Sequence, residues 1–79
     1  STELDVRGAR LNDAVETVTR YIDDAIMLNV SSVRIIHGKG TGVLRDELQK
    51  LIRTMPGVAS AKDEHIQFGG SGVTVVTFE

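Results

Sequence analysis

The alternation of apolar and polar residues predicts four strands along the chain. Residues 3–7 alternate polar and apolar and end at a glycine, which is typical of a half-buried strand. Residues 33–37 and 73–78 are short runs rich in β-branched side chains, which favour buried strands. Residues 58–62 form a weaker extended stretch with few large apolar side chains, and we expect a strand there as well.

Two amphipathic helices are predicted between the first three strands. Apolar residues recur every three or four positions over residues 14–28, which indicates a helix of about four turns. Asn12 or Asp13 can cap its start, and Glu16 stands at the capping-box spacing from Asp13. The second helix covers residues 43–55 and is ended by the proline and glycine that follow.

The order strand, helix, strand, helix, strand, strand predicts a single domain over residues 1–79 with an α/β two-layer sandwich fold. Strand-helix-strand units favour parallel neighbours, so the first three strands should run the same way, with both helices laid on the sheet. Ligands of open α/β sheets bind at the carboxyl ends of the strands. These carboxyl ends form one edge of the sheet. Arg7 and residues 37–42 should lie at that edge, and so should the loop at residues 69–72 if the last strand returns antiparallel.

Residues 37–42, here called the glycine turn, join a predicted strand directly to a predicted helix. Such a junction presents free backbone N–H groups and the positive end of the helix dipole, which suit an anionic phosphate. The alternative is a tight connection without a ligand, and the glycine spacing excludes both the dinucleotide fingerprint and a Walker loop. The candidate phosphate-binding residues at this edge are Gly38, Lys39, Gly40, Thr41, Gly42, Arg45, Gly69, Gly70 and Ser71.

Three side chains near the same edge are candidates for catalysis. His37 ends its strand there, where an imidazole can hydrogen-bond a phosphate or transfer a proton; the alternative is a structural histidine bonded to the backbone. Asp5 and Arg7 lie two residues apart on one strand face. They form either a surface ion pair, or a base or metal ligand beside a cation that stabilises charge in phosphodiester cleavage.

Composition and charge narrow the classes of function further. No cysteine is present, which excludes disulfides, thiolate metal sites and a cysteine nucleophile. The net charge of -2 is not that of a strongly basic nucleic-acid binder, but residues 34–53 contain five cations and two carboxylates around the glycine turn. One tyrosine and two phenylalanines offer few stacking surfaces, so we expect contacts to the phosphate backbone rather than to bases. We see neither an apolar run of about 18 residues nor a signal peptide, and expect a cytoplasmic protein without membrane contact.

Together these segments resemble the Smr (small MutS-related) domain, most closely the version that closes bacterial MutS-two proteins. The resemblance runs from Leu4 to Phe78 and rests on three motifs. They are LDVRG at residues 4–8, IHGKGTGVLR at residues 36–45 and GGSGVTVV at residues 69–76.

The resemblance implies a mixed four-stranded sheet with the last strand antiparallel, similar to the C-terminal domain of translation initiation factor three. It also implies an endonuclease that nicks DNA, including branched DNA, or cleaves RNA, with the ribosome as a further partner. The chain would then be the excised C-terminal domain of a larger, homodimeric protein with an ATPase portion, linked to recombination suppression and ribosome rescue. We expect the isolated domain to be a monomer without a tightly bound cofactor, and a divalent metal can serve cleavage.

The first motif departs from the family pattern at one position. Many cleaving relatives carry Asp-x-His-Gly there, whereas this chain has Arg7 in place of the histidine. Arginine keeps its proton at neutral pH, so cleavage needs Asp5, His37, water or a metal to transfer protons. The leading hypothesis is an endonuclease domain. The alternatives are a non-catalytic module that targets DNA, RNA or the ribosome, and a protein-interaction domain.

Overall fold

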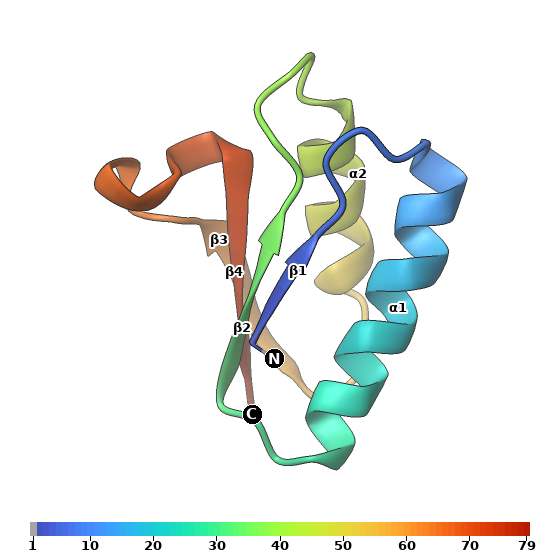
Figure 1. Cartoon of the computed structure of the whole chain (residues 1–79). Helices are drawn as coiled ribbons and strands as arrows, with labels where there is room; N and C mark the ends of the chain where they lie inside the picture. Colours follow the sequence, from blue (N-terminus) through green and yellow to red (C-terminus); the bar gives the residue numbers. More distant parts are fainter. Residues whose placement is uncertain (1) are drawn as a thin grey trace.

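The chain folds into two layers, and the computed structural model describes residues 2–79 (Figure 1). Both helices lie on one face of a four-stranded sheet, which confirms the predicted α/β sandwich. The elements in chain order are β1 (Glu3–Asp5), α1 (Leu11–Met27), β2 (Ser32–Ile36), α2 (Val43–Ile52), β3 (Val58–Asp63), the short 3-10 helices η1 (Ile66–Phe68) and η2 (Gly70–Gly72), and β4 (Val73–Phe78).

The strands lie in the order β1-β2-β4-β3 across the sheet. β1 pairs with β2 in parallel, and β4 runs antiparallel to both of its neighbours, as expected. Because β4 begins where β2 ends, the Gly72 carbonyl accepts hydrogen bonds from the N–H groups of His37 and Gly38, at 3.1 and 2.9 Å. The glycine turn and the loop before β4 therefore lie at one edge of the sheet, as predicted, and the start of β1 and the end of β4 lie at the opposite edge (Figure 1).

The core lies between the helices and the sheet. Alternate strand residues point toward the helices, so Val33 and Ile35 of β2 pair with Val76 and Thr74 of β4 on the inner face. The largest fully buried side chains are Ile22, Ile35, Leu48, Ile52, Val18, Val33, Val76 and Thr74. The other face, here called the open face, bears no helix within residues 2–79 and carries polar side chains such as Arg34 and Ser60. No helix within that range is long and apolar enough to cross a membrane.

The predicted cap of α1 is wrong. The helix begins at Leu11 with Arg10 at the N-cap, and no side-chain cap hydrogen bond forms at this end within residues 2–79. A tight turn after β1, closed by a 3.1 Å hydrogen bond from the Ala9 N–H, starts the helix earlier than expected. Asn12 and Asp13 therefore lie inside the first turn, where the Asp13 carboxylate complements the helix dipole without capping.

Several other boundaries differ from the expectation by one to three residues, and the largest shifts are at the ends of β1 and α2. β1 ends at Asp5 instead of continuing to Arg7. α2 ends at Ile52 instead of reaching Met55, because the chain tightens into bonds between residues three apart, such as the 3.0 Å bond from the Met55 N–H to the Ile52 carbonyl. The proline that follows Met55 also disfavours helical backbone at that residue.

Candidate functional site

The glycine turn leads from β2 to α2 with its backbone in the left-handed region. The φ angle is +78° at Gly38, +42° at Gly40 and +87° at Gly42, a region that residues with side chains rarely adopt. Gly42 is the N-cap of α2 and provides no side chain, and the Thr41 hydroxyl accepts from the Val43 N–H only at 3.4 Å. The start of α2 thus leaves its N–H groups and the positive end of the dipole open to an anion.

Lys39 and residues 69–72 stand beside the glycine turn. Lys39 is exposed and makes no ion pair within residues 2–79. Gly72 approaches it closely, since a Cβ added there would lie 3.3 Å from the Lys39 Cγ. Gly69 and Ser71 are exposed, whereas Gly70 is buried. Lys39 and the loop that ends at Gly72 therefore lie side by side at this edge.

His37 is buried beneath the turn, with 4% of its surface exposed. Its Nδ1 lies 2.9 Å from the Gly38 carbonyl oxygen, and its Nε2 lies 2.7 Å from Thr74 Oγ1. A carbonyl oxygen can only accept, so Nδ1 carries the proton and Nε2 accepts from the Thr74 hydroxyl. Both ring nitrogens are thus used inside the protein. This geometry supports a positioning role, and proton transfer by His37 stays a prediction.

Thr74, Gln49 and Asp63 extend this hydrogen-bond network, and the sequence analysis missed all three. Gln49 Nε2 donates to Thr74 Oγ1 at 3.0 Å and to Asp63 Oδ1 at 2.8 Å. Arg45 donates to both Asp63 oxygens at 2.7 and 3.0 Å. The hydrogen bonds from Arg45 and then Gln49 hold the pKa of the Asp63 carboxyl below its ordinary value. A signal existed in β4, where alternation places Thr74 on the same inward face as Val76.

Asp5 and Arg7 form a two-pronged ion pair beside the turn. Arg7 Nε donates to Asp5 Oδ1 at 3.0 Å and Nη2 to Oδ2 at 2.7 Å, and the Arg7 backbone N–H also donates to Oδ1. The side-chain and then the backbone hydrogen bonds from Arg7 lower the pKa of the Asp5 carboxyl to about 2. Arg7 lies against the turn, because a Cβ on Gly38 would be 3.5 Å from its Cγ. The structure thus brings Arg7 to the turn but leaves His37 on the helix side of the sheet, away from Asp5.

Two of the five cations in residues 34–53, Arg34 and Arg45, are paired with carboxylates. The partners are Glu3 and Glu64 for Arg34, and Asp46 and Asp63 for Arg45. Three of these carboxylates lie outside residues 34–53, so tertiary contacts reduce the positive excess expected from that stretch. Arg45 is consequently engaged within the protein, and Lys39 is the cation at the turn that is left without an ion pair among residues 2–79.

The structure offers no obvious set of metal ligands. No group of three or more His, Asp or Glu side chains within residues 2–79 is placed to hold a metal ion. The Asp5 carboxylate is committed to Arg7. The use of a divalent metal in cleavage therefore stays a prediction from the sequence.

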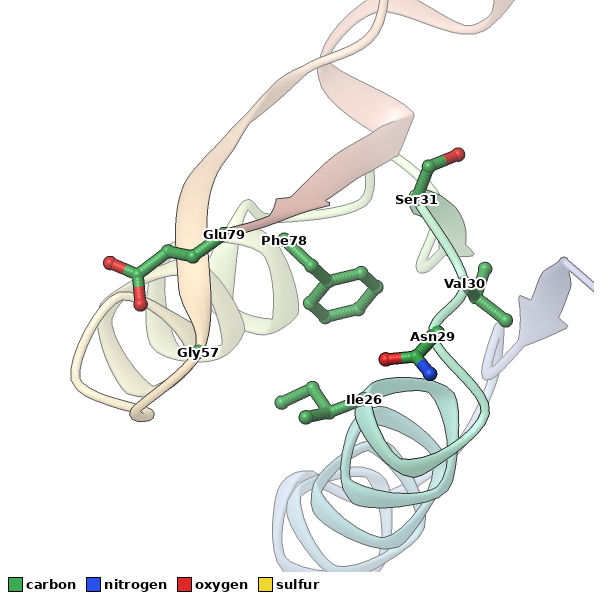
Figure 2. Close-up of a pocket in the computed structure, with 7 residues that line it drawn as sticks. All are labelled: Ile26, Asn29, Val30, Ser31, Gly57, Phe78 and Glu79. Carbon is green, nitrogen blue, oxygen red and sulfur yellow. The ribbon is translucent and has the colours of Figure 1, made fainter.

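A surface pocket of about 370 Å³ lies at the opposite edge of the molecule (Figure 2). Figure 2 shows the side chains of Ile26 and Phe78 directed toward each other across it. It is lined by Ile26, Asn29, Val30, Ser31, Gly57, Phe78 and Glu79. This lining offers one carboxylate and no cation to a phosphate, so the candidate site remains at the glycine turn.

These features define a class, a small α/β domain with a glycine-rich strand-turn-helix junction at one edge of its sheet. The family model of the Smr domain matches residues 4–79, and the chain belongs to this family. The first motif thus belongs to an Smr domain that carries Arg7 at its fourth position.

Similar proteins agree with this assignment. The chain is 49% identical over 76 residues to "Endonuclease MutS2" of Acetivibrio thermocellus, covering 96% of this chain and 10% of the relative. It is 47% identical to "Putative endonuclease MutS2" of Bacillus subtilis over the same shares. The chain spans about a tenth of the length of these curated relatives.

Two crystal structures have the same fold. The Smr domain of Thermus thermophilus MutS2 matches with a TM-score of 0.95 at 37% identity, covering 100% of this chain and 99% of that one. YdaL, a stand-alone small MutS-related protein from Escherichia coli, matches with a TM-score of 0.91 at 21% identity, covering 99% of this chain and 64% of that one. The second likeness is one of fold.

Removing the Thr74 hydroxyl should disturb His37 and the fold together. We expect Thr74→Val to cost about 1–3 kcal/mol, because His37 Nε2 and Gln49 Nε2 each lose a buried partner. Urea unfolding measures this loss, and ring ¹⁵N shifts of His37 should show that Nδ1 no longer holds the proton exclusively. Thr74→Ser keeps the hydroxyl and should keep the tautomer. An unchanged tautomer in Thr74→Val would contradict the assigned network.

The Asp5 carboxyl should titrate with a midpoint near pH 2, measured by side-chain ¹³C NMR. In Arg7→Ala the midpoint should rise toward the ordinary 3.8 without reaching it, because the backbone N–H of residue 7 still donates. Since the folded pKa is depressed, the stabilisation from this pair is present at neutral pH and disappears as the pH falls from about 4 to about 2. Arg20→Ala serves as the control, and equal midpoints in wild type and Arg7→Ala would exclude the ion pair.

Proposed function

We propose that this domain binds the phosphate backbone of DNA or RNA at the glycine turn. The observation that carries the proposal is the open start of α2, next to three positive-φ glycines and the unpaired Lys39. Backbone N–H groups and the helix dipole bind phosphate without reading sequence. Gly69 and Ser71 line the same edge and add exposed polar backbone and a hydroxyl.

We propose further that the domain cleaves the phosphodiester bond, with Arg7 stabilising negative charge at the reacting phosphate. Its relatives bear the name endonuclease, which supports this activity. The ion pair uses Arg7 Nε and Nη2, and it leaves the N–H groups of Nη1 for a phosphate oxygen. Asp5, with a pKa of about 2, is a weak base, so its main contribution is to orient Arg7. A hydroxide from solvent then attacks the phosphorus while the P–O bond to one sugar breaks, and solvent protonates the leaving sugar oxygen.

A second candidate is a non-catalytic module that targets nucleic acid or the ribosome. The observation that favours it is the absence of a free proton-transfer group at the turn within residues 2–79. His37 has both ring nitrogens engaged, and Asp5 is held by Arg7. Binding at the glycine turn is common to both candidates, and cleavage separates them.

The setting of the domain is part of the proposal. Because the chain spans about a tenth of its MutS2 relatives, we propose that it is the C-terminal domain of a larger cytoplasmic protein. That protein would be a homodimer with an ATPase portion, acting on branched DNA or stalled ribosomes in recombination suppression or ribosome rescue. The isolated domain would be a monomer.

Binding to duplex DNA should weaken with salt. If about four phosphates are neutralised, a plot of log affinity against log salt concentration should have a slope of about -3.6. Lys39→Ala should make this slope shallower by about one unit. Arg45→Ala should change the slope less, because its guanidinium is already paired with Asp46 and Asp63. Lys50→Ala, an exposed lysine in the last turn of α2, is the matched control. A flat salt response would contradict phosphate binding.

Cleavage should be tested with supercoiled plasmid, branched DNA and structured RNA, with and without a divalent metal. We expect nicked or shortened products from the wild type and at least about a 100-fold lower rate from Arg7→Ala, on the scale of losing one charge-stabilising donor. Asp5→Ala should lower the rate by less, since Arg7 keeps its charge. Equal rates in wild type and Arg7→Ala would remove Arg7 from the mechanism. No cleavage by the wild type, with binding intact, would establish the non-catalytic candidate.

A further inference from the structure

The loop between β3 and β4 exposes two large apolar side chains. Ile66 and Phe68 of η1 are 82% and 64% exposed. The other two tyrosine and phenylalanine residues, Tyr21 and Phe78, are partly buried against the core. Phe68 is thus the phenyl ring most open to solvent among the described residues, although composition alone suggested that stacking surfaces would be scarce.

Hydrogen bonds hold the backbone of the loop that carries Phe68. The N–H groups of Phe68 and Gly70 both donate to the His65 carbonyl, at 2.8 and 3.1 Å. Arg34 Nη2 donates to the Phe68 carbonyl at 2.8 Å, which ties η1 to the open face. Gly69 adopts φ +129°, and a Cβ there would lie 2.5 Å from a Val73 methyl, so the loop geometry depends on glycine. Stacking of a ligand on Phe68 therefore costs little conformational entropy for ordering the loop.

The ring lies near the proposed phosphate-binding edge. The loop ends at Gly72, whose carbonyl bonds the N–H groups of His37 and Gly38. Phe68 and Gly72 are four residues apart, so their Cα atoms are at most about 14 Å apart. A stacked strand advances about 3.4 Å per base. A strand held by the glycine turn therefore brings a base to Phe68 within about four nucleotides.

The size of the exposed surface favours a base over a protein. One phenylalanine buries about 150–250 Å² at most, whereas a stable protein interface needs about 800 Å² from each partner. Polar and charged residues precede Phe68 closely in the chain, among them the exposed Gln67 and Lys62 and the half-buried Glu64. The ring of His65 lies beside that of Phe68, with the two ring centroids 5.8 Å apart and the ring planes tilted by 51°. A single flat aromatic ligand matches the remaining surface.

We propose that Phe68, supported by Ile66, is a stacking site for one unpaired nucleobase of the strand whose phosphates occupy the glycine turn. The inference rests on the proposed function. Bases in a paired duplex are already stacked on both faces, so this site selects bulged, branched or single-stranded positions. Phosphate contacts then supply affinity, and Phe68 directs the domain to irregular nucleic acid.

The test compares a duplex that carries one bulged 2-aminopurine with the same duplex fully paired, at one salt concentration. We expect Phe68→Ala to weaken binding to the bulged probe by about five- to 150-fold and to leave the paired probe within about twofold. Stacking should quench 2-aminopurine fluorescence in wild type and in Phe68→Tyr, but not in Phe68→Ala. Leu28 is 76% exposed at the C-cap of α1, and Leu28→Ala is the matched control for removing an apolar side chain.

The outcomes separate this inference from the proposed function. Lys39→Ala should weaken both probes equally; if it weakens neither and binding ignores salt, phosphate binding fails whatever Phe68 does. If Lys39→Ala acts as expected but Phe68→Ala binds both probes like the wild type, the stacking site is overturned and η1 is free for a protein partner. Equal urea midpoints for wild type and Phe68→Ala exclude unfolding as the cause of any loss.

Discussion

The hydrogen bond from the Thr74 hydroxyl to His37 Nε2 underlies the geometry of the whole functional edge. It joins the end of β2 to β4 inside the core, directly beneath the glycine turn. Gln49 completes it by donating to the same hydroxyl from α2. Buried polar groups are costly unless fully paired, and no side-chain nitrogen or oxygen buried within residues 2–79 lacks a partner. The network therefore fixes β2, β4 and α2 relative to one another. Because the glycine turn joins β2 to α2, its position is fixed as well.

Charge pairing decides which groups at this edge remain available to a ligand. Arg34 and Arg45 are each held by two carboxylates, and Arg7 by one. Together with a net charge of -2, these pairs reduce the positive charge that could attract nucleic acid over a distance. Under the proposed function, recognition depends on short-range contacts with Lys39, the Arg7 Nη1 group and the open backbone N–H groups. Other parts of the proposed larger protein would then bring the nucleic acid to this edge.

The replacement of histidine by Arg7 in the first motif is compatible with an unchanged fold. Arg7 is largely exposed and lies after the end of β1, so the core does not depend on its identity. Arginine retains charge stabilisation and loses proton transfer, because its proton is not released at neutral pH. The proposed phosphate binding rests on backbone geometry, whereas the proposed chemistry at the same edge depends on one exposed position.

The sequence by itself determined the order of elements, the inward faces of the strands and the glycine turn, because hydrophobic period and glycine spacing are local properties. Residues 73–78 form β4 with the bounds that their β-branched run predicts. The tertiary structure alone decided that His37 is enclosed, that Arg45 is neutralised by Asp63, and that Phe68 is exposed. Each of these three features depends on which distant residue contacts the side chain. The position of a residue in the sequence does not indicate that tertiary contact. The glycine turn could be predicted from the sequence because its backbone geometry depends on the residues of the turn itself. Its chemical surroundings could not, because residues distant in the sequence meet there only when the sheet forms.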